Sequence, residues 1–287
     1  MEKYEFIREL GSGSYGSVKL AKDIQTKELY AIKKVKLSGL LKEERMKAEG
    51  EVKVLSSISH PNIVAYKESF HKKSSLYIVM EYIDGGDLAK IIENQRNTLM
   101  DESEILRYFV QIVQVVKYLH SNHVLHRDLK PQNIFVTKLG IVKLGDFGVA
   151  KTLDGSANLA HTMIGTPYYL SPEIWNGSLY DSKSDIWSLG CILFELCSLK
   201  KAFTATSITQ LMPAIMNGRH DPIPPRYSSD MKMLVDSMLN ITPQLRPTAE
   251  EISELPFIKK ALTALIERNQ RVLNAQIEKR SRIPQPI

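Results

Sequence analysis

Cysteine is nearly absent from this chain: its 287 residues contain only Cys191 and Cys197. A small domain held together by disulfides is thereby excluded, because such domains need a much higher cysteine content. Both cysteines lie in an apolar stretch with helical spacing, which favours buried, reduced thiols over a disulfide or a metal pair. A chain of this length with 43% apolar residues can instead bury a large hydrophobic core.

Long apolar runs and repeated segments are also missing. No stretch approaches the roughly eighteen apolar residues of a membrane-spanning helix. The N-terminus begins with a strand-like pattern where a secretion signal would need an apolar run, so we expect neither secretion nor a transmembrane segment. Internal repeats and low-complexity tracts are absent as well, which leaves one or two globular domains, located in the cytoplasm.

Positive charge is concentrated at one end. The net charge is +6, and residues 259–282 contain seven basic and two acidic residues, a net +5. Such a segment could contact an acidic partner, nucleic acid or a microtubule surface, and the alternative is a solvated helix that extends the domain. We predict no specific nucleic-acid binding.

The periodicity of the sequence changes once. Residues 4–36 and 76–80 alternate as strands do, and from about residue 88 the spacing becomes helical. Asp84, Gly85 and Gly86 suit neither regular element, so residues 81–87 are expected to form a hinge.

A glycine-rich segment, Gly11-Ser12-Gly13-Ser14-Tyr15-Gly16-Ser17-Val18, opens the strand region. The pattern G-x-G-x-x-G alone is weak, because dinucleotide-binding domains also use it. There the third glycine opens a helix, whereas here strand alternation continues after Gly16. We therefore predict a β-hairpin whose glycines let backbone amides approach phosphates.

The strongest motif is His126-Arg127-Asp128-Leu129-Lys130-Pro131-Gln132-Asn133, followed after twelve residues by Asp146-Phe147-Gly148. Together they provide a base, two metal ligands and a charge clamp, in the right order behind a glycine-rich loop and the strand lysine Lys33. From residue 4 to about residue 258 the chain resembles the eukaryotic protein kinases, which implies phosphoryl transfer from ATP.

The resemblance implies an α+β fold of two lobes, with the active site between them. Residues 1–80 would form a small antiparallel sheet with one helix, residues 81–87 the hinge, and residues 88–258 a larger, mainly helical lobe. Residues 259–287 would be a basic helical extension of the single kinase domain, 4–258.

Catalytic roles also follow from the resemblance. Asp128 would accept the proton of the substrate hydroxyl, Lys130 would steady the γ-phosphate, and Lys33 would hold the α- and β-phosphates. Asn133 and Asp146 would bind Mg²⁺, which prefers hard oxygen ligands, with Mn²⁺ as a substitute. The residues expected to contact ATP are Gly11, Ser12, Gly13, Ser14, Tyr15, Gly16, Val18, Ala31, Lys33, Glu51, Met80, Glu81, Ile83, Asp87 and Phe135.

A carboxylate should orient Lys33, and the helix expected over residues 42–58 offers several. Spacing relative to the family selects Glu51. Glu49 is the main rival, but two helical residues rotate it by about 200° from that face. Gly50 would weaken this helix by roughly 1 kcal/mol relative to alanine, so Glu51 could move in and out of range of Lys33.

Other matched residues are expected to be structural. His126 would pack beneath Phe147 and form an apolar column between the lobes with Leu55 and Tyr66. The segment Gly165-Thr166-Pro167-Tyr168-Tyr169-Leu170-Ser171-Pro172-Glu173 would receive the substrate peptide, with Ser171 in place of the usual alanine, and Glu173 would form a buried ion pair with Arg246. Lys130 together with Thr166 matches the pattern of serine/threonine kinases.

Within the family the chain resembles the NIMA-related kinases, on the runs Leu144–Gly148, Gly165–Ile174 and Lys183–Cys197. This implies a cell-cycle, centrosomal, ciliary or microtubule-linked role, in the cytoplasm, at the cytoskeleton or centrosome, or in the nucleus. Two alternatives stay open. An inactive scaffold would normally lack Lys33, Asp128 or Asp146, and a small-molecule phosphotransferase would lack the peptide segment.

Thr162 matches the activation-loop phosphosite of this group, with Ser156 and Thr166 as competing sites. A phosphate there could be clamped by Arg127, Lys151 and Lys47.

Substrate choice follows from three positions. Asp87 could attract a substrate arginine, but Gln132 stands where strongly basophilic kinases have glutamate. By resemblance we expect an apolar residue three positions before the acceptor. The β-branched Val149 after the Asp-Phe-Gly motif indicates tolerance of, or preference for, threonine as the acceptor.

Overall fold

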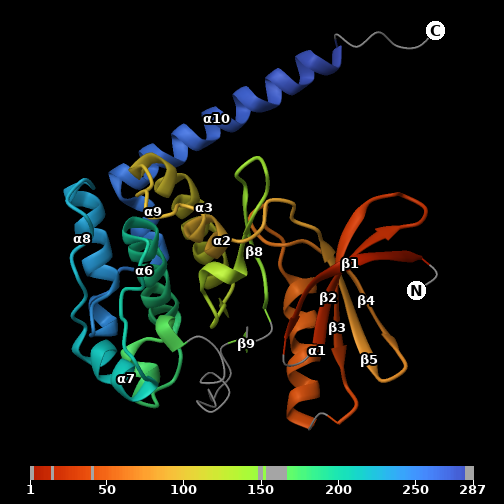
Figure 1. The fold of residues 1–287 in the computed structure, drawn as a ribbon, viewed down its shortest axis with the longest axis horizontal. Coiled ribbons are helices and arrows are strands. Elements are labelled where there is room, and N and C mark those ends of the chain that lie inside the picture. Colours follow the sequence, from red (N-terminus) through yellow and green to blue (C-terminus); the bar gives the residue numbers. More distant parts are fainter. Residues whose placement is uncertain (1–2, 14–15, 40–41, 148–150, 153–166, 282–287) are drawn as a thin grey trace.

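The computed structural model describes residues 3–13, 16–39, 42–147, 151–152 and 167–281, without the side chains of residues 42–44, 47, 51, 151–152 and 276–281. These residues form a small lobe around one antiparallel sheet and a larger, mainly helical lobe, which lie side by side in Figure 1. The predicted α+β fold of two lobes is confirmed.

The small lobe is a five-stranded sheet in the order β1-β2-β3-β5-β4, with every neighbouring pair antiparallel. Alternation along the strands gathers Tyr30, Ile32 and Val79 in one buried cluster, which turns Ala31 and Lys33 to the opposite face. The strands are β1 Tyr4–Gly13, β2 Gly16–Asp23, β3 Leu29–Lys36, β4 Tyr66–Lys72 and β5 Ser75–Glu81.

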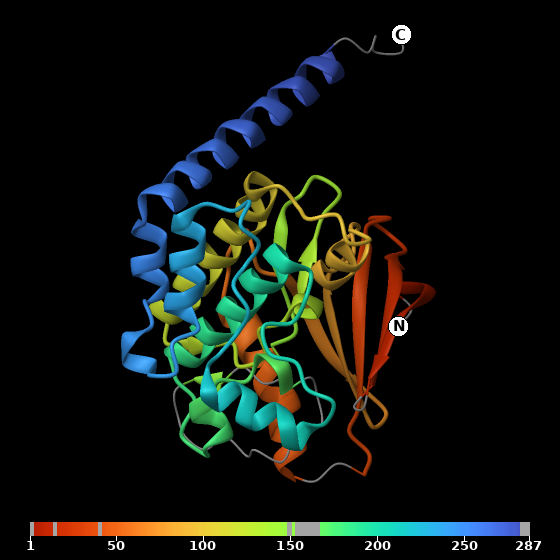
Figure 2. The ribbon, with the colours of Figure 1, turned by 60° about the vertical axis from the view of Figure 1, so that its left-hand side comes forward.

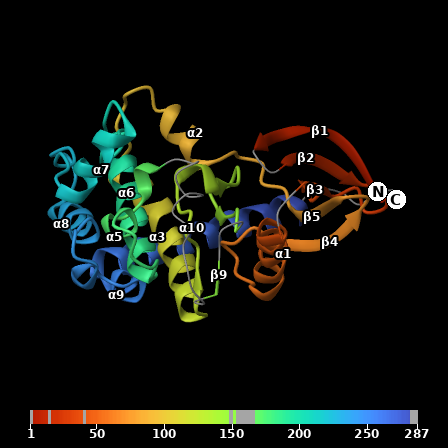
Figure 3. The same ribbon diagram turned by 90° about the horizontal axis from the view of Figure 1, so that it is seen from below.

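One helix, α1 (Lys42–Ser57), accompanies the sheet, as seen from below in Figure 3. Its buried residues Val54 and Leu55 belong to the large core cluster, which continues into the helical lobe. A methyl group added at Gly50 would meet no atom within 4 Å. Packing therefore does not require glycine there, and its weakening of the helix, about 1 kcal/mol relative to alanine, is not offset by a close approach.

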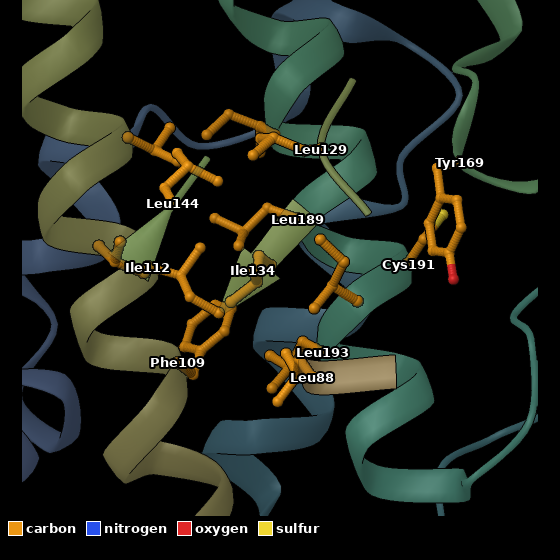
Figure 4. Close-up of a cluster of buried hydrophobic side chains, with 14 of the residues drawn as sticks. Leu88, Phe109, Ile112, Leu129, Ile134, Leu144, Tyr169, Leu189, Cys191 and Leu193 are labelled. Carbon is orange, nitrogen blue, oxygen red and sulfur yellow. The ribbon is translucent and has the colours of Figure 1, made fainter. Parts of the chain in front are cut away.

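The large lobe is built around two buried helices, α3 and α6. Figure 4 shows their apolar side chains, among them Phe109, Ile112 and Leu189, packed against Leu88 and Ile134. The helices are α2 Leu88–Glu93, α3 Glu102–Ser121, α5 Pro172–Trp175, α6 Ser182–Ser198, α7 Ile208–Asn217, α8 Ser229–Met238, α9 Ala249–Glu254 and α10 Pro256–Ser281. Short elements connect them: β6 Val124–Leu125, η1 Pro131–Asn133, β7 Ile134–Val136, β8 Val142–Leu144, β9 Lys151–Thr152, η2 Pro167–Tyr169 and η3 Pro243–Leu245.

Both cysteines lie buried and free in α6, as predicted. Burial raises the pKa of the Cys197 thiol to about 12, and burial also raises the pKa of Cys191. The thiols therefore stay protonated and contribute to packing.

The C-terminal helix α10 begins at Pro256, so the expected boundary after residue 258 falls inside it. Its first turns pack against α3 and α9, where Ile258 and Leu265 are buried. Farther along, Ile266 and Leu273 are exposed, and the helix projects away from the lobe in Figures 1 and 2. None of the helices within the described ranges is long and apolar enough to span a membrane.

Candidate active site

The glycine-rich segment forms the predicted hairpin between β1 and β2. Gly11 pairs with Val18 and Gly13 with Gly16, so no helix follows the third glycine. A Cβ at Gly16 would lie 1.8 Å from the carbonyl oxygen of Lys34, which only glycine permits. The predicted contacts Ser14 and Tyr15, at the tip, lie outside the described residues.

The residues expected to contact ATP come from both lobes. Val18 pairs with Lys33 across β2 and β3, and Ala31 pairs with Met80 across β3 and β5, so these side chains share one face of the sheet. From the other lobe, Phe135 forms a backbone bridge with Asp87 at the hinge. The sheet face and the hinge thus frame the position expected for the nucleotide.

Two hinge residues that are expected to contact ATP use their side chains for contacts within the protein. The Glu81 carboxylate lies 2.9 Å from Lys143 Nζ and accepts a hydrogen bond from the Ala65 amide. Asp87 accepts from the Lys90 amide at 2.9 Å and caps the first turn of α2. The Glu81 carboxylate is thus engaged within the protein, which favours contact with a nucleotide through the Glu81 backbone. Ile83 lies between these two residues and is half-buried.

Lys33 and Asp146 meet between the lobes. Lys33 Nζ donates to Asp146 Oδ1 at 3.0 Å. Desolvation alone would raise the pKa of Asp146, but the charge and hydrogen bond of Lys33 hold it below its usual value. Asp146 is thus a carboxylate, as a metal ligand must be.

The partner predicted for Lys33 is Glu51. The side chain of Glu51 lies outside the described residues, so this pairing stays a prediction. The rival Glu49 is exposed, in agreement with the rotation that the helical period gives it.

Three predicted residues converge in the loop formed by residues 126–133, the predicted catalytic loop. Asp128 Oδ2 accepts hydrogen bonds from Lys130 Nζ at 2.7 Å and from Asn133 Nδ2 at 2.9 Å. Asn133 Nδ2 also donates to the backbone carbonyl of Asp128, and the short helix η1 carries Asn133 into this position. With Oδ2 held by two donors, Oδ1 is the oxygen that can accept a proton from a substrate.

Asp185, in α6, anchors the start of this loop. Its buried carboxylate accepts from the amides of His126 and Arg127, both at 3.1 Å. It also contacts His120 Nε2 at 2.8 Å and the Tyr180 hydroxyl at 2.7 Å. These bonds hold Arg127 at a φ of 68°, a conformation that is strained for a residue with a side chain.

The sequence patterns did not predict the link between Asp185 and the catalytic loop. Burial alone would raise the pKa of Asp185, but its hydrogen bond with His120 and the charges of His120 and His126 lower it. One signal was available: an aspartate within an apolar helical run needs several donors.

His126 packs against Phe147 as predicted, with ring centroids 5.0 Å apart. Both side chains are buried, and His126 Nε2 lies 3.2 Å from the carbonyl oxygen of Gly145. Leu55 is buried in the same core, and Tyr66 packs against that core. A structural role for His126 accords with this burial.

The candidate metal ligands lie close together. The Gly145 amide donates to the Asn133 carbonyl at 3.0 Å, which brings Asp146 beside Asn133. Within the described ranges no three His, Cys, Asp or Glu side chains form a preformed metal cage. Mg²⁺ fits this arrangement, because it is commonly held by one or two protein oxygens, substrate phosphates and water.

The described part of the peptide segment starts at Pro167, and Ser171 is buried. The predicted ion pair is confirmed: Arg246 Nη1 and Nη2 contact the two Glu173 oxygens at 2.7 and 2.8 Å. Arg246 also lies over the Trp187 ring, 4.9 Å from its centroid.

The predicted phosphosite Thr162 lies outside the described residues, as do the competing sites and the side chains of Lys47 and Lys151. Arg127 is described: its Nε is buried without a hydrogen-bond partner among the described residues. Burial lowers the pKa of its guanidinium. An anion would satisfy this group.

Comparison with known proteins agrees with this geometry. The family described as "Protein kinase domain" matches residues 4–258. Mouse serine/threonine-protein kinase Nek1 is 47% identical over 262 residues, which cover 91% of this chain and 22% of that protein. Mouse Nek4 is 42% identical over 92% of this chain and 34% of its own length. Mouse Nek3 is 44% identical over 93% of this chain and 53% of its own length. The chain thus spans about half or less of these relatives.

Proposed function

The chain belongs to the protein kinase family and matches the Nek serine/threonine kinases within it, and from this premise we propose that it transfers the γ-phosphate of ATP to serine and threonine hydroxyls of proteins. The observation that carries the proposal is the convergence of Lys130 and Asn133 on one oxygen of Asp128. This arrangement fixes the base and leaves its second oxygen for the substrate.

Each residue has a defined task in this reaction. Asp128 Oδ1 orients the acceptor hydroxyl and receives its proton. Lys130, 2.7 Å from Asp128 Oδ2, places positive charge beside the transferred group, and Lys33 places a second charge near the other phosphates. Preorganised charges of this kind contribute because they need no rearrangement during the reaction.

Asn133 and Asp146 would hold Mg²⁺, with Mn²⁺ as a substitute. Asn133 would use its carbonyl oxygen Oδ1, because its nitrogen donates to Asp128. The ion would neutralise charge on the phosphates. Asp146 is kept ionised for this purpose by Lys33.

Phosphorylation of a degenerate serine/threonine peptide library with ATP and Mg²⁺, with autophosphorylation sites mapped in the same reaction, tests the proposal. We expect transfer to peptides that requires both ATP and the divalent ion. A protein that binds ATP but modifies no peptide would support the scaffold alternative. Transfer to small-molecule alcohols alone would support the small-molecule phosphotransferase.

The basic part of α10 supports a second, finer proposal. Because the helix projects from the lobe and its described side chains in residues 266–275 are mostly exposed, we propose that it contacts an acidic partner such as the microtubule surface. This would accord with a cell-cycle, centrosomal or ciliary role and with a location in the cytoplasm, at the cytoskeleton or centrosome, or in the nucleus.

Co-sedimentation with microtubules tests the contact. The wild type should pellet at low salt and progressively less as salt rises, because exposed charges are screened. The double variant Arg268→Glu, Arg271→Glu should stay in solution. A control with equal charge change, Lys72→Glu, Lys73→Glu, reverses two exposed lysines of the small lobe and should pellet like the wild type. Equal pelleting of both variants would overturn the proposal.

A further inference from the structure

Lys201, Glu195 and Tyr169 form a polar cluster within the large lobe. Lys201 Nζ lies 2.6 Å from Glu195 Oε1, and the Tyr169 hydroxyl donates to Glu195 Oε2 at 2.6 Å. Lys201 Nζ also donates to the Tyr169 hydroxyl and lies over its ring, 4.8 Å from the centroid. Each of the three side chains thus contacts the other two.

The cluster depends on Lys201 for its charge balance. The Glu195 side chain is only 8% exposed, whereas that of Lys201 is 28% exposed. Burial together with the charge of Glu195 raises the pKa of Tyr169 far above its usual value, so its hydroxyl stays protonated and donates. Tyr169 therefore supplies a hydrogen bond but no charge, and a buried carboxylate without a cation is costly.

Lys201 reaches Glu195 from the loop that follows α6. Leu199 ends this helix in the left-handed conformation, with a φ of 58°, and so reverses the chain toward it. Lys201 is more exposed than the nearly buried Glu195 that it contacts. We therefore expect removal of the lysine side chain to open a path from solvent to the Glu195 carboxylate and to leave that carboxylate without its cation.

The cluster also holds the segment expected to receive the substrate peptide. Tyr169 closes the short helix η2, and its carbonyl accepts a hydrogen bond from Ser188 Oγ at 2.8 Å. Figure 4 shows Tyr169 beside Cys191, one turn before Glu195 in α6. A cation site at Glu195 would therefore lie next to a peptide bound along this segment.

We propose that Lys201 is a specificity-determining residue, which occupies a cation site that Glu195 would otherwise offer to a basic side chain of the peptide substrate. The inference rests on the proposed kinase function. The lysine acts as an internal substitute for a substrate arginine, and the chain consequently does not select a basic residue at the position that faces Glu195. Substrate specificity is the difference between the affinities for two peptides. The lysine bound at Glu195 removes the additional affinity that a basic peptide would otherwise have there.

Peptide selection by Lys201→Ala tests the inference. This variant should gain about a tenfold preference for arginine or lysine at one position flanking the acceptor, as expected for a charged hydrogen bond. Lys201→Gln keeps a hydrogen-bonding group without the charge, and it should show a gain in the same direction if Lys201→Ala is too unstable to purify. Thermal melting establishes that each variant is folded.

Two controls separate charge from packing. In the double variant Lys201→Ala, Glu195→Gln the opened path has no charge, so the gained preference should disappear. Lys200→Ala removes the neighbouring exposed lysine and should leave the selection profile unchanged. If Lys201 were only a structural contact, its variants would alter melting temperature without changing selection.

The possible failures can be told apart. A wild type that modifies no peptide would overturn the proposed function, and the inference with it. An active wild type together with folded, active Lys201 variants of unchanged selection would overturn the inference alone. A gained basic preference that survives the Glu195→Gln change would also overturn it, because the site would then lie elsewhere.

Discussion

Lys33 Nζ lies 3.0 Å from Asp146 Oδ1. This contact joins β3 of the small lobe to Asp146, the second residue after β8 in the large lobe. The two residues are 113 positions apart in the chain. Each needs the other: Lys33 keeps Asp146 ionised, and Asp146 accepts a hydrogen bond from the lysine. A change at either residue should therefore affect both nucleotide binding and transfer.

Replacing the catalytic residues should abolish transfer without unfolding the protein. Asp128→Ala should lower turnover by roughly 10²–10⁴-fold, because a positioned base is lost. Lys33→Met should have a similar effect, and Asp146→Ala should in addition weaken Mg²⁺-dependent nucleotide binding. Steady-state transfer to a peptide and calorimetric ATP titration measure the two effects.

A neighbouring lysine provides the control for Lys33. Lys34 lies on the same strand with its ammonium over the Tyr77 ring, on the face away from Lys33. Lys34→Met should retain most of the activity. If Asp128→Ala kept more than about a tenth of wild-type turnover, the assignment of the base would be wrong.

Phosphorylation of Thr162 should activate the protein. The buried Nε of Arg127 has no partner among the described residues, and a phosphate would supply charge of about −1.5 to −2. Thr162→Ala should lower activity severalfold, whereas Ser156→Ala should not. Mass spectrometry of active protein together with initial rates checks this prediction. Unmodified Thr162 in fully active protein would contradict it.

Substrate peptides with an apolar residue three positions before the acceptor should be preferred over arginine peptides by roughly tenfold. Asp87 is engaged as the cap of α2 and lies 3.3 Å from Lys90 Nζ, so its carboxylate is already used. Asp87→Asn, which can still cap the helix, should change arginine selection less than twofold by this reasoning. Threonine should be accepted beside serine, and dominant arginine selection or exclusive use of serine would refute the prediction.

Local pattern and spacing predicted much of this site. Continued alternation after Gly16 distinguished a hairpin from a helix, and the fixed spacing around Asp128 identified residues that meet within one loop. Such information is local, because the strand period and the loop length set which groups can meet. The burial of Cys191 followed in the same way from its apolar surroundings.

The sequence did not reveal contacts whose partners lie far apart. Asp185 could not be linked to the amides of His126 and Arg127, because any of many donors could have satisfied a buried carboxylate. The contact between Lys201 and Glu195 depends on the chain reversal at Leu199, which the hydrophobic periodicity of the sequence does not predict.

The Glu173–Arg246 pair should be the most sensitive of the predicted structural contacts. The Arg246 side chain is fully buried, so Arg246→Leu would leave the Glu173 carboxylate unpaired and should lower the free energy of unfolding by about 3–5 kcal/mol. Urea denaturation measures this loss. Lys259→Leu, which removes an exposed partner of Glu254, should change it by less than about 1 kcal/mol.

The same pair predicts a dependence on pH. Burial alone would raise the pKa of Glu173, but the hydrogen bonds and charge of Arg246 lower it below its usual value. Because the folded-state pKa lies below the unfolded one, the stabilisation is complete above about pH 5 and is lost as the pH falls through the lowered value. The stability difference between wild type and Glu173→Gln should therefore be constant above about pH 5 and shrink as the pH falls below that value. A difference that stays constant below about pH 5 as well would show that the charge of Glu173 does not contribute.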